Sequence, residues 1–234
     1  MKPVVICCYA PHEGPGHFAT YLDRHRIPRR VVKLDESEPL PDTKTIGGLA
    51  MMGGPMSVND DLPWVRPMLD FIRVCVDGDV PVIGHCLGGQ LMARALGGCV
   101  TRNSVTEIGW APVDVVDSAT AALWGTPEPF LSFQWHSETF SIPAGAQRIW
   151  SSEHCANQAF AIGKHLAMQC HIEMTEEMIE RWCESGEDEI QSHLQRSPAV
   201  QTAAAIREEL PAKLARLNRV ADRIYDSWTR NLSP

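Results

Sequence analysis

A cysteine flanked by glycines is the residue in this chain best suited to chemistry. Cys86 lies in the sequence Gly-His-Cys-Leu-Gly-Gly-Gln at residues 84–90, directly after the apolar run Pro-Val-Ile at 81–83. Glycines two residues before and two residues after a nucleophile are typical of a nucleophile elbow, a sharp turn from a strand into a helix. Residues 87–96 have the pattern of that helix, which ends at Gly-Gly. We therefore expect Cys86 at a helix N-terminus, where the helix dipole favours a negatively charged sulfur.

A histidine and a glutamate much later in the chain offer the other groups that such a nucleophile needs. His171 and Glu173 lie in Gln-Cys-His-Ile-Glu at residues 169–173. Side chains two residues apart in an extended segment point to the same side, so the carboxylate can orient the imidazole. An imidazole held in this way can serve a thiolate in acyl transfer. The sequence therefore predicts a catalytic triad of Cys86, His171 and Glu173.

Five short motifs follow one another over residues 3–175. They are Gly-Gly-Pro-Met at 53–56, Gly-His-Cys-Leu-Gly-Gly-Gln at 84–90, Glu-Ile-Gly-Trp at 107–110, Trp-His-Ser-Glu-Thr-Phe at 135–140 and Gln-Cys-His-Ile-Glu at 169–173. In this order they resemble the class I (triad-type) glutamine amidotransferases, most of all the stand-alone proteins similar to the glutaminase domain of GMP synthase. That family usually has Gln-Phe-His-Pro-Glu as the last motif, so Cys170 and Ile172 are departures that keep the spacing.

The resemblance implies a role for further residues. The loop at 53–56 follows a predicted strand, so the backbone N–H groups of Gly54 and Leu87 are expected to form an oxyanion hole. By resemblance, Gln90 contacts the bound glutamine, and the segment 133–138 holds its amino-acid end, with His136 and Ser137 as the named residues. The expected ligand is a small molecule, glutamine or a γ-glutamyl compound.

Other residues with chemical potential receive a structural interpretation. His85 is expected to pack behind the elbow, and His12 and Glu13 are expected to border the crevice without a catalytic duty. The chain has no H-E-x-x-H or H-x-x-E-H spacing, no P-loop and no G-x-G-x-x-G motif. Neither a metal ion nor a cofactor is therefore expected.

Composition narrows the class of protein. The chain has 234 residues, 44% of them hydrophobic, and a formal net charge of −8. This acidic balance argues against a nucleic-acid partner. No apolar run approaches the ~18–20 residues of a membrane span, and the first apolar run is too short for a signal peptide. The eight cysteines include no C-x-x-C pair, so we expect reduced thiols and a cytoplasmic location.

Strands and helices alternate along the first part of the chain. This pattern predicts an α/β fold, an open, mostly parallel sheet flanked by helices, with the flavodoxin-like arrangement that the resemblance implies. Strands are expected at 3–9, 30–34, 48–52 and 81–85, and helices at 16–25, 62–78 and 87–96. Short β runs at 99–116, 130–135, 147–151, 158–162 and 166–172 predict an antiparallel edge after the parallel core.

The chain is expected to divide into a catalytic domain, residues 1–175, and a C-terminal helical extension, residues 176–234. Helices are expected at 175–184, 188–195 and 198–230. From residue 210 apolar residues recur four and three apart. We favour packing of this stripe on its own domain, with a homodimer or a partner-docking helix as the alternative. The stripe consists of Leu210, Leu214, Leu217, Ala221, Ile224 and Trp228.

Three functions remain open from the sequence. The first is a glutaminase that forms a γ-glutamyl thioester on Cys86 and releases glutamate, with ammonia passing to a separate acceptor enzyme. The second is a self-contained γ-glutamyl hydrolase or peptidase. The third is a non-catalytic binding protein on the same fold, which the presence of all three triad residues disfavours.

Overall fold

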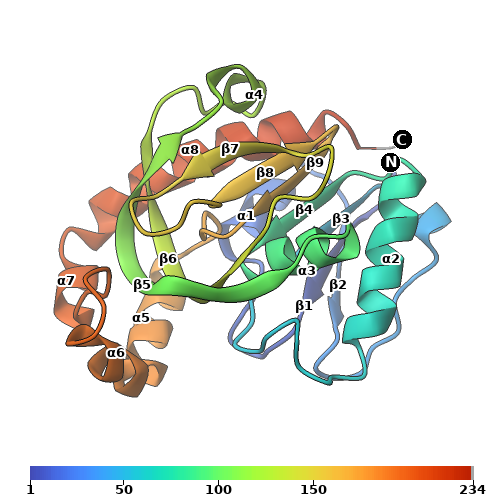
Figure 1. Ribbon diagram of the computed structural model, residues 1–234. Coiled ribbons are helices and arrows are strands. Elements are labelled where there is room, and N and C mark those ends of the chain that lie inside the picture. The colour runs from blue at the N-terminus through green and yellow to red at the C-terminus, as the bar shows by residue number, and fades with distance from the viewer. Residues whose placement is uncertain (233–234) are drawn as a thin grey trace.

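The computed structural model describes residues 1–232 of the chain. Its strands are β1 (Val4–Cys8), β2 (Arg29–Lys33), β3 (Gly48–Met51), β4 (Val82–His85), β5 (Val100–Val115), β6 (Phe130–Phe140), β7 (Gln147–Ser151), β8 (Ala159–Ile162) and β9 (His165–Met168). They form a nine-stranded sheet in the order β2-β1-β3-β4-β9-β8-β7-β5-β6 (Figure 1). The strands from β2 to β9 pair in parallel, and the pairs from β9 to β6 are antiparallel. The predicted α/β fold with a parallel core and an antiparallel edge is confirmed.

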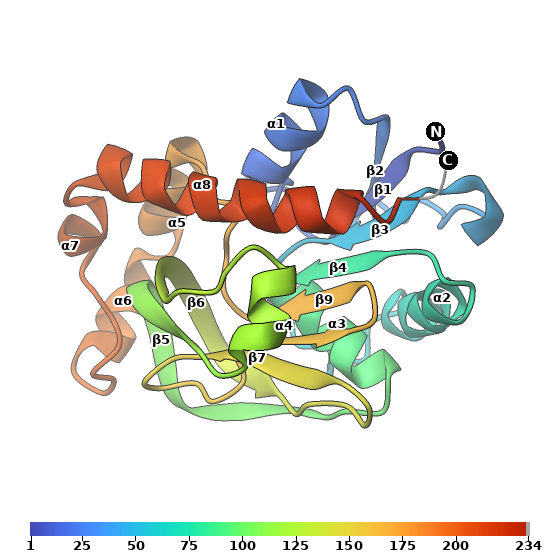
Figure 2. The same ribbon diagram turned by 90° about the horizontal axis from the view of Figure 1, so that it is seen from above.

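Helices cover both faces of the parallel strands, because those strands are apolar on both sides. Along β1, Ile6 packs in a core with residues of α1 and α8, whereas Cys7 packs in a second core with residues of α2 and α3. Figure 2 shows α8 lying across the sheet beside α1. None of the helices in the described part of the chain is long and apolar enough to cross a membrane. The helices are α1 (Gly16–Arg24), α2 (Val65–Asp77), α3 (Leu87–Ala95), α4 (Ser118–Leu123), α5 (Glu176–Ser185), α6 (Glu187–Leu194), α7 (Ala203–Arg207) and α8 (Leu210–Thr229), with a short 3₁₀ helix, η1 (Thr43–Thr45).

One predicted strand ends earlier than the sequence suggests. The strand expected at 166–172 ends at Met168, because the chain then leaves β8 and crosses to β6. The backbone N–H of Gln169 still donates to the carbonyl of Gln158, at 2.8 Å, but that of His171 donates to the carbonyl of Phe133, at 2.9 Å. Residues 169–172 are therefore not part of β9, although the side chains of His171 and Glu173 still meet as the sequence predicts.

The prediction of a single helix at 198–230 is wrong, since an extended segment and two helices replace it. The Gln201 side-chain amide accepts from the backbone N–H of Trp110 at 2.9 Å and donates to its carbonyl at 3.0 Å, which holds residues 199–201 along β5. Gly109 leaves room for this amide. Between α7 and α8, Glu209 has a φ of 51°, a left-handed conformation that ends one helix and starts the next.

The apolar stripe of α8 packs inside the chain itself. Its members are all 6% exposed or less, and they belong to the core on the α1 side of the sheet. These side chains are not available to a second copy or a partner helix, so the favoured interpretation of the stripe is the correct one. The C-terminal extension is thus part of the main hydrophobic core.

We predict that Leu217→Ala lowers the free energy of unfolding by about 2–5 kcal/mol, because Leu217 is fully buried in α8 and its loss leaves a cavity. Leu123→Ala is the matched control, since Leu123 is 75% exposed on α4. Its effect should stay within about 0.5 kcal/mol. Urea denaturation measures both values. Equal stability of the two variants would contradict the packing of α8 described above.

Candidate active site

A strained turn between β4 and α3 presents Cys86. This residue has φ 48° and ψ −107°, a backbone conformation that non-glycine residues rarely adopt. Two neighbouring strands hold the turn in place. The backbone N–H of Cys86 donates to the carbonyl of Met168 at 2.9 Å, and that of Gly88 donates to the carbonyl of Met52 at 3.1 Å. The predicted elbow is present, with Cys86 as the residue before the first turn of α3.

Glycines allow the elbow to close against the sheet. A Cβ on Gly84 would lie 2.5 Å from the carbonyl carbon of Gly88, which no side chain tolerates. A Cβ on Gly88 or on Gly89 would collide with the carbonyl oxygen of Met51 or of Met168. The first turn of α3 can approach β3 and β9 this closely only because these positions carry no side chain.

His171 and Glu173 form a buried ion pair in the same region. Nδ1 of His171 lies 2.6 Å from Oε1 of Glu173, and each residue is 1% exposed. The rings of His171 and of Trp182 from α5 pack edge to face, with ring centroids 4.9 Å apart and planes at 87°. The loop after β9, not a strand, thus brings the histidine and the carboxylate together beside Cys86.

The electrostatics of this pair favour a charged histidine. Burial by itself disfavours the imidazolium, but the negative charges of Glu173 and Cys86 outweigh it and raise the pKa of His171 well above its usual range. Burial likewise acts to raise the pKa of Glu173, yet the positive charge of His171 dominates and lowers it. The arrangement can therefore hold an imidazolium ready to donate a proton to a group bound near Cys86.

A chain of side-chain amides connects the predicted substrate contact Gln90 with the nucleophile. Nε2 of Gln90 donates to Oε1 of Gln169 at 3.2 Å and lies 3.4 Å from the carbonyl oxygen of Glu138. Nε2 of Gln169 lies 3.5 Å from the sulfur of Cys86. Gln169 belongs to the last of the five motifs, but no role was predicted for it. Its position one residue after β9 at the carboxyl edge of the sheet was the available signal.

The two backbone groups predicted for the oxyanion hole lie on adjacent segments. A Cβ on Gly54 would lie 2.7 Å from Cδ2 of Leu87, so the loop after β3 touches the start of α3. Within residues 1–232 neither of these two N–H groups donates to a protein acceptor. Both N–H groups therefore remain able to donate a hydrogen bond.

A cavity of about 460 Å³ opens over Cys86 and His171. Gly54, Gln90, His136 and Ser137 line it, as expected from the sequence, and so do the loop after β1 and residues of β5 and β6. Its volume lies within the ~300–1,000 Å³ typical of small-molecule sites. The part of the wall that α5 and α6 supply was not predicted, because nothing in the amphipathic pattern of these helices marks residues that face a cavity. That part consists of Trp182, Ser185, Gly186 and Glu189.

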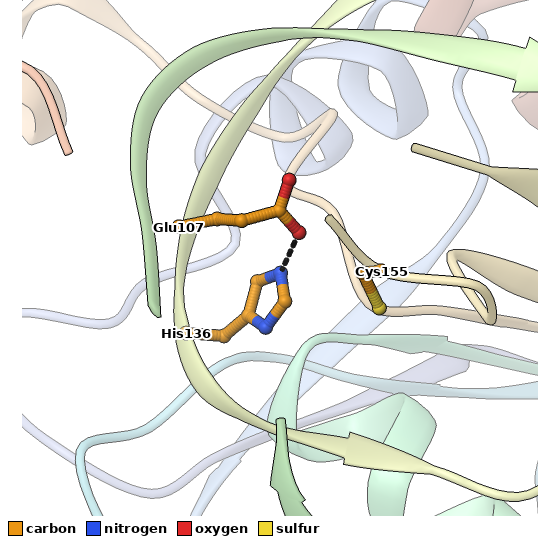
Figure 3. Close-up of side chains that lie close together, drawn as sticks. All are labelled: Glu107, His136 and Cys155. Atoms are coloured by element: carbon orange, nitrogen blue, oxygen red, sulfur yellow. Dashed lines mark ion pairs between the residues drawn. The ribbon is translucent and has the colours of Figure 1, made fainter. Parts of the chain in front are cut away.

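His136 belongs to a second buried cluster, beside the cavity (Figure 3). Its Nε2 lies 3.0 Å from Oε2 of Glu107, and Cys155 completes a set whose donor atoms lie within 4.8 Å of one another. Both carboxylate oxygens already accept hydrogen bonds, from Ser152 at 2.9 Å and from Gln158 at 3.0 Å. Burial raises the pKa of the Cys155 thiol to about 11, which disfavours the thiolate form that would bind a metal ion. We interpret this cluster as a hydrogen-bonded support for the segment 135–138.

His85 packs behind the elbow, as the sequence analysis expects. Its Nδ1 lies 3.3 Å from the carbonyl oxygen of Met51, and its Nε2 lies 3.2 Å from the hydroxyl of Tyr225 on α8. Burial lowers the pKa of this imidazole, so it stays neutral. The contact connects the C-terminal helix with the residue before the nucleophile.

Comparison with known proteins assigns this arrangement to a family. The model of the family described as glutamine amidotransferase class-I matches residues 18–180. The chain belongs to this family. A crystal structure of a glutamine amidotransferase from Methylobacillus flagellatus is 45% identical and covers 100% of this chain and 96% of its own, with a TM-score of 0.95.

The matches to two curated relatives cover a smaller part of this chain. The glutamine amidotransferase-like protein YfeJ of Salmonella typhimurium is 28% identical over 160 residues, which are 64% of this chain and 66% of that protein. A glutamine-hydrolyzing GMP synthase of Lactobacillus delbrueckii is 31% identical over 149 residues, which are 59% of this chain and 28% of that protein. The chain thus spans about two thirds of the first relative and just over a quarter of the second. The resemblance stated from the motifs is confirmed.

We predict that Gly84→Ala destabilises the amidotransferase by about 1–3 kcal/mol, since its methyl group would press on the backbone of the elbow helix. Gly14→Ala is a matched control, because a Cβ at that position meets no atom within 4 Å. Urea unfolding compares the two variants. A Gly84→Ala protein as stable as the Gly14→Ala protein would refute the close approach inferred here.

We also predict that Glu173→Gln lowers the pKa of His171, because the carboxylate is the largest influence that raises it. The imidazolium should then lose its proton at a lower pH than in the unchanged protein. Nitrogen chemical shifts of labelled histidine, recorded over a pH series, follow this directly. An unchanged titration of His171 would show that the carboxylate does not control its charge.

Proposed function

We propose that this class-I amidotransferase hydrolyses the γ-amide of glutamine through a thioester on Cys86. The observation that carries the proposal is the position of Cys86 on a strained elbow beside the buried His171–Glu173 pair, at the floor of one cavity. A nucleophile, a proton donor and an orienting carboxylate are the groups that acyl transfer requires. The reaction thus belongs to the amide hydrolases, with Cys86, His171 and Glu173 as the proposed catalytic triad.

The proposed acylation step begins with attack of the Cys86 thiolate on the γ-carbonyl carbon. The carbonyl π electrons move to oxygen, and the N–H groups of Gly54 and Leu87 stabilise the oxyanion. The imidazolium of His171 then donates its proton to the amide nitrogen, the C–N bond breaks and ammonia leaves. A γ-glutamyl thioester and a neutral imidazole remain. The unused hydrogen-bonding capacity of the two backbone groups supports this assignment.

Water completes the proposed cycle. The neutral His171 takes a proton from water as the oxygen attacks the thioester, and collapse of the second oxyanion breaks the C–S bond. Glutamate leaves, and the thiolate and imidazolium are restored. We assign Gln90 and Ser137 to substrate contact because both line the cavity. The ring of His136 is engaged by Glu107 and by the carbonyl of Glu138, so its proposed role is to hold the segment around it.

The two parts of the chain have different proposed roles. We propose residues 1–175 as the catalytic domain and residues 176–234 as an extension that closes the cavity. Trp182 and Glu189 support this division, because they come from the extension and line the cavity. The extension packs in the main core, so the division concerns role and not independent folding.

We propose further that the ammonia serves a separate acceptor enzyme. The support is the GMP synthase relative, whose name describes glutamine hydrolysis coupled to synthesis and of which this chain matches only 28%. The alternative is a γ-glutamyl hydrolase that cleaves a larger compound. The cavity volume of about 460 Å³ supports this alternative as well, because sites of this size also bind molecules larger than glutamine, such as a γ-glutamyl dipeptide.

We predict glutamate release when the purified protein is given L-glutamine, and loss of that release in Cys86→Ala. The substitution removes the nucleophile without adding volume, so the thermal unfolding midpoint should barely change. A coupled glutamate dehydrogenase assay measures the product. Release from a γ-glutamyl dipeptide but not from glutamine would favour the γ-glutamyl hydrolase. Release that persists in Cys86→Ala would remove the cysteine from the mechanism.

A further inference from the structure

The carboxylate of Glu13 lies next to His171 on the cavity side. Glu13 belongs to the loop after β1, whose turn is closed by a hydrogen bond from its N–H to the carbonyl of Ala10, at 3.2 Å. A Cβ placed on Gly53 would be 2.9 Å from Oε2 of Glu13 and 3.0 Å from Cε1 of His171. The carboxylate oxygen and the imidazole edge therefore flank the same glycine, and both residues line the cavity with Cys86.

The surroundings of Glu13 differ from those of the other carboxylates in the cavity. Glu138 accepts a hydrogen bond from Ser57, and Glu189 accepts one from Trp135. In the part of the chain that the structure describes, the Glu13 carboxylate has no hydrogen-bond donor and no ion pair.

The charge of Glu13 is correspondingly poorly stabilised. Burial raises its pKa to about 7, with a lowering contribution from His171 and a raising one from Glu173. A carboxylate in this setting gains from a cationic partner. Among the described residues, the imidazolium of His171 is the charge that lowers the pKa of Glu13.

We propose that Glu13 binds the leaving nitrogen of the substrate and stabilises its positive charge as the C–N bond breaks. This inference rests on the proposed function. When His171 donates its proton, the amide nitrogen becomes an ammonium group attached to the tetrahedral carbon. Its N–H groups then need acceptors, and the carboxylate beside the imidazole supplies one. The C–N electron pair goes to nitrogen, so the group departs as neutral ammonia or amine, and no further reactant is needed.

The same contact defines a class of substrate. Glu13 favours γ-glutamyl amides, whose leaving atom becomes cationic, over γ-glutamyl esters, whose leaving oxygen does not. Glutamine and the γ-methyl ester of glutamate differ in that leaving group but form the same thioester on Cys86. A comparison of the two substrates therefore isolates the leaving-group contact from everything that follows acylation.

The experiment measures kcat/KM of Glu13→Gln on both substrates. The substitution keeps the shape and removes the charge. We expect kcat/KM for glutamine to fall about 10- to 100-fold, the value of one hydrogen bond to a charged group. The value for the ester should change less than about threefold. Glu128→Gln, at an exposed position away from the cavity, controls for the loss of a surface carboxylate.

Each other outcome has a definite meaning. An equal loss on amide and ester would mean that Glu13 only supports the local structure, and an unchanged amide rate would mean that it does not contact the leaving group. Either result overturns this inference and leaves the proposed function intact. If the protein without substitutions turned over neither glutamine nor the ester, the proposed function would be overturned, and this inference with it. Partial recovery of the amide rate in Glu13→Asp is expected, because the negative charge returns at a shorter reach.

Discussion

The sharp turn at Cys86 is the constraint on which the rest of the structure depends. The turn is strained, so it persists only because its neighbours hold it from several sides. The carbonyls of Met168 and Met52 accept from its backbone, and glycines allow α3 to lie against β3 and β9. The parallel strands must therefore keep their relative positions at their carboxyl ends. The hydrophobic cores on both faces of the sheet provide that rigidity.

Burial of the His171–Glu173 pair depends in turn on helices far along the chain. Trp182 of α5 covers the imidazole, and Tyr225 of α8 contacts His85 behind the elbow. Without these covers, water would screen the pair and weaken the interaction that keeps the histidine charged. The C-terminal helices thus shield the His171–Glu173 pair from solvent, although they contribute no member of it.

Local sequence patterns predicted much of this structure, but they failed where contacts between distant residues determine the backbone conformation. The elbow, the alternating elements and the positions of Cys86, His171 and Glu173 follow from short motifs whose spacing fixes local geometry. The end of β9 at Met168 and the extended segment at Gln201 do not, because each depends on a partner across the fold. The N-cap of α4, where Asp117 accepts from two backbone N–H groups, was a readable signal that the sequence analysis passed over. Glu13 was expected at the crevice, but its approach to His171 arises only from folding.

The part of the cavity wall that α5 and α6 supply comes from a different stretch of the chain than the elbow that holds Cys86. Residues that hold the nucleophile lie inside the stretch that the family model matches, which ends at residue 180, whereas Trp182 and Glu189 lie beyond it. Substitutions at Glu189 can reshape the space offered to a ligand without touching the elbow, whereas Trp182 also covers His171. In this chain the residues that hold Cys86 and the residues of this wall thus belong to different stretches of sequence.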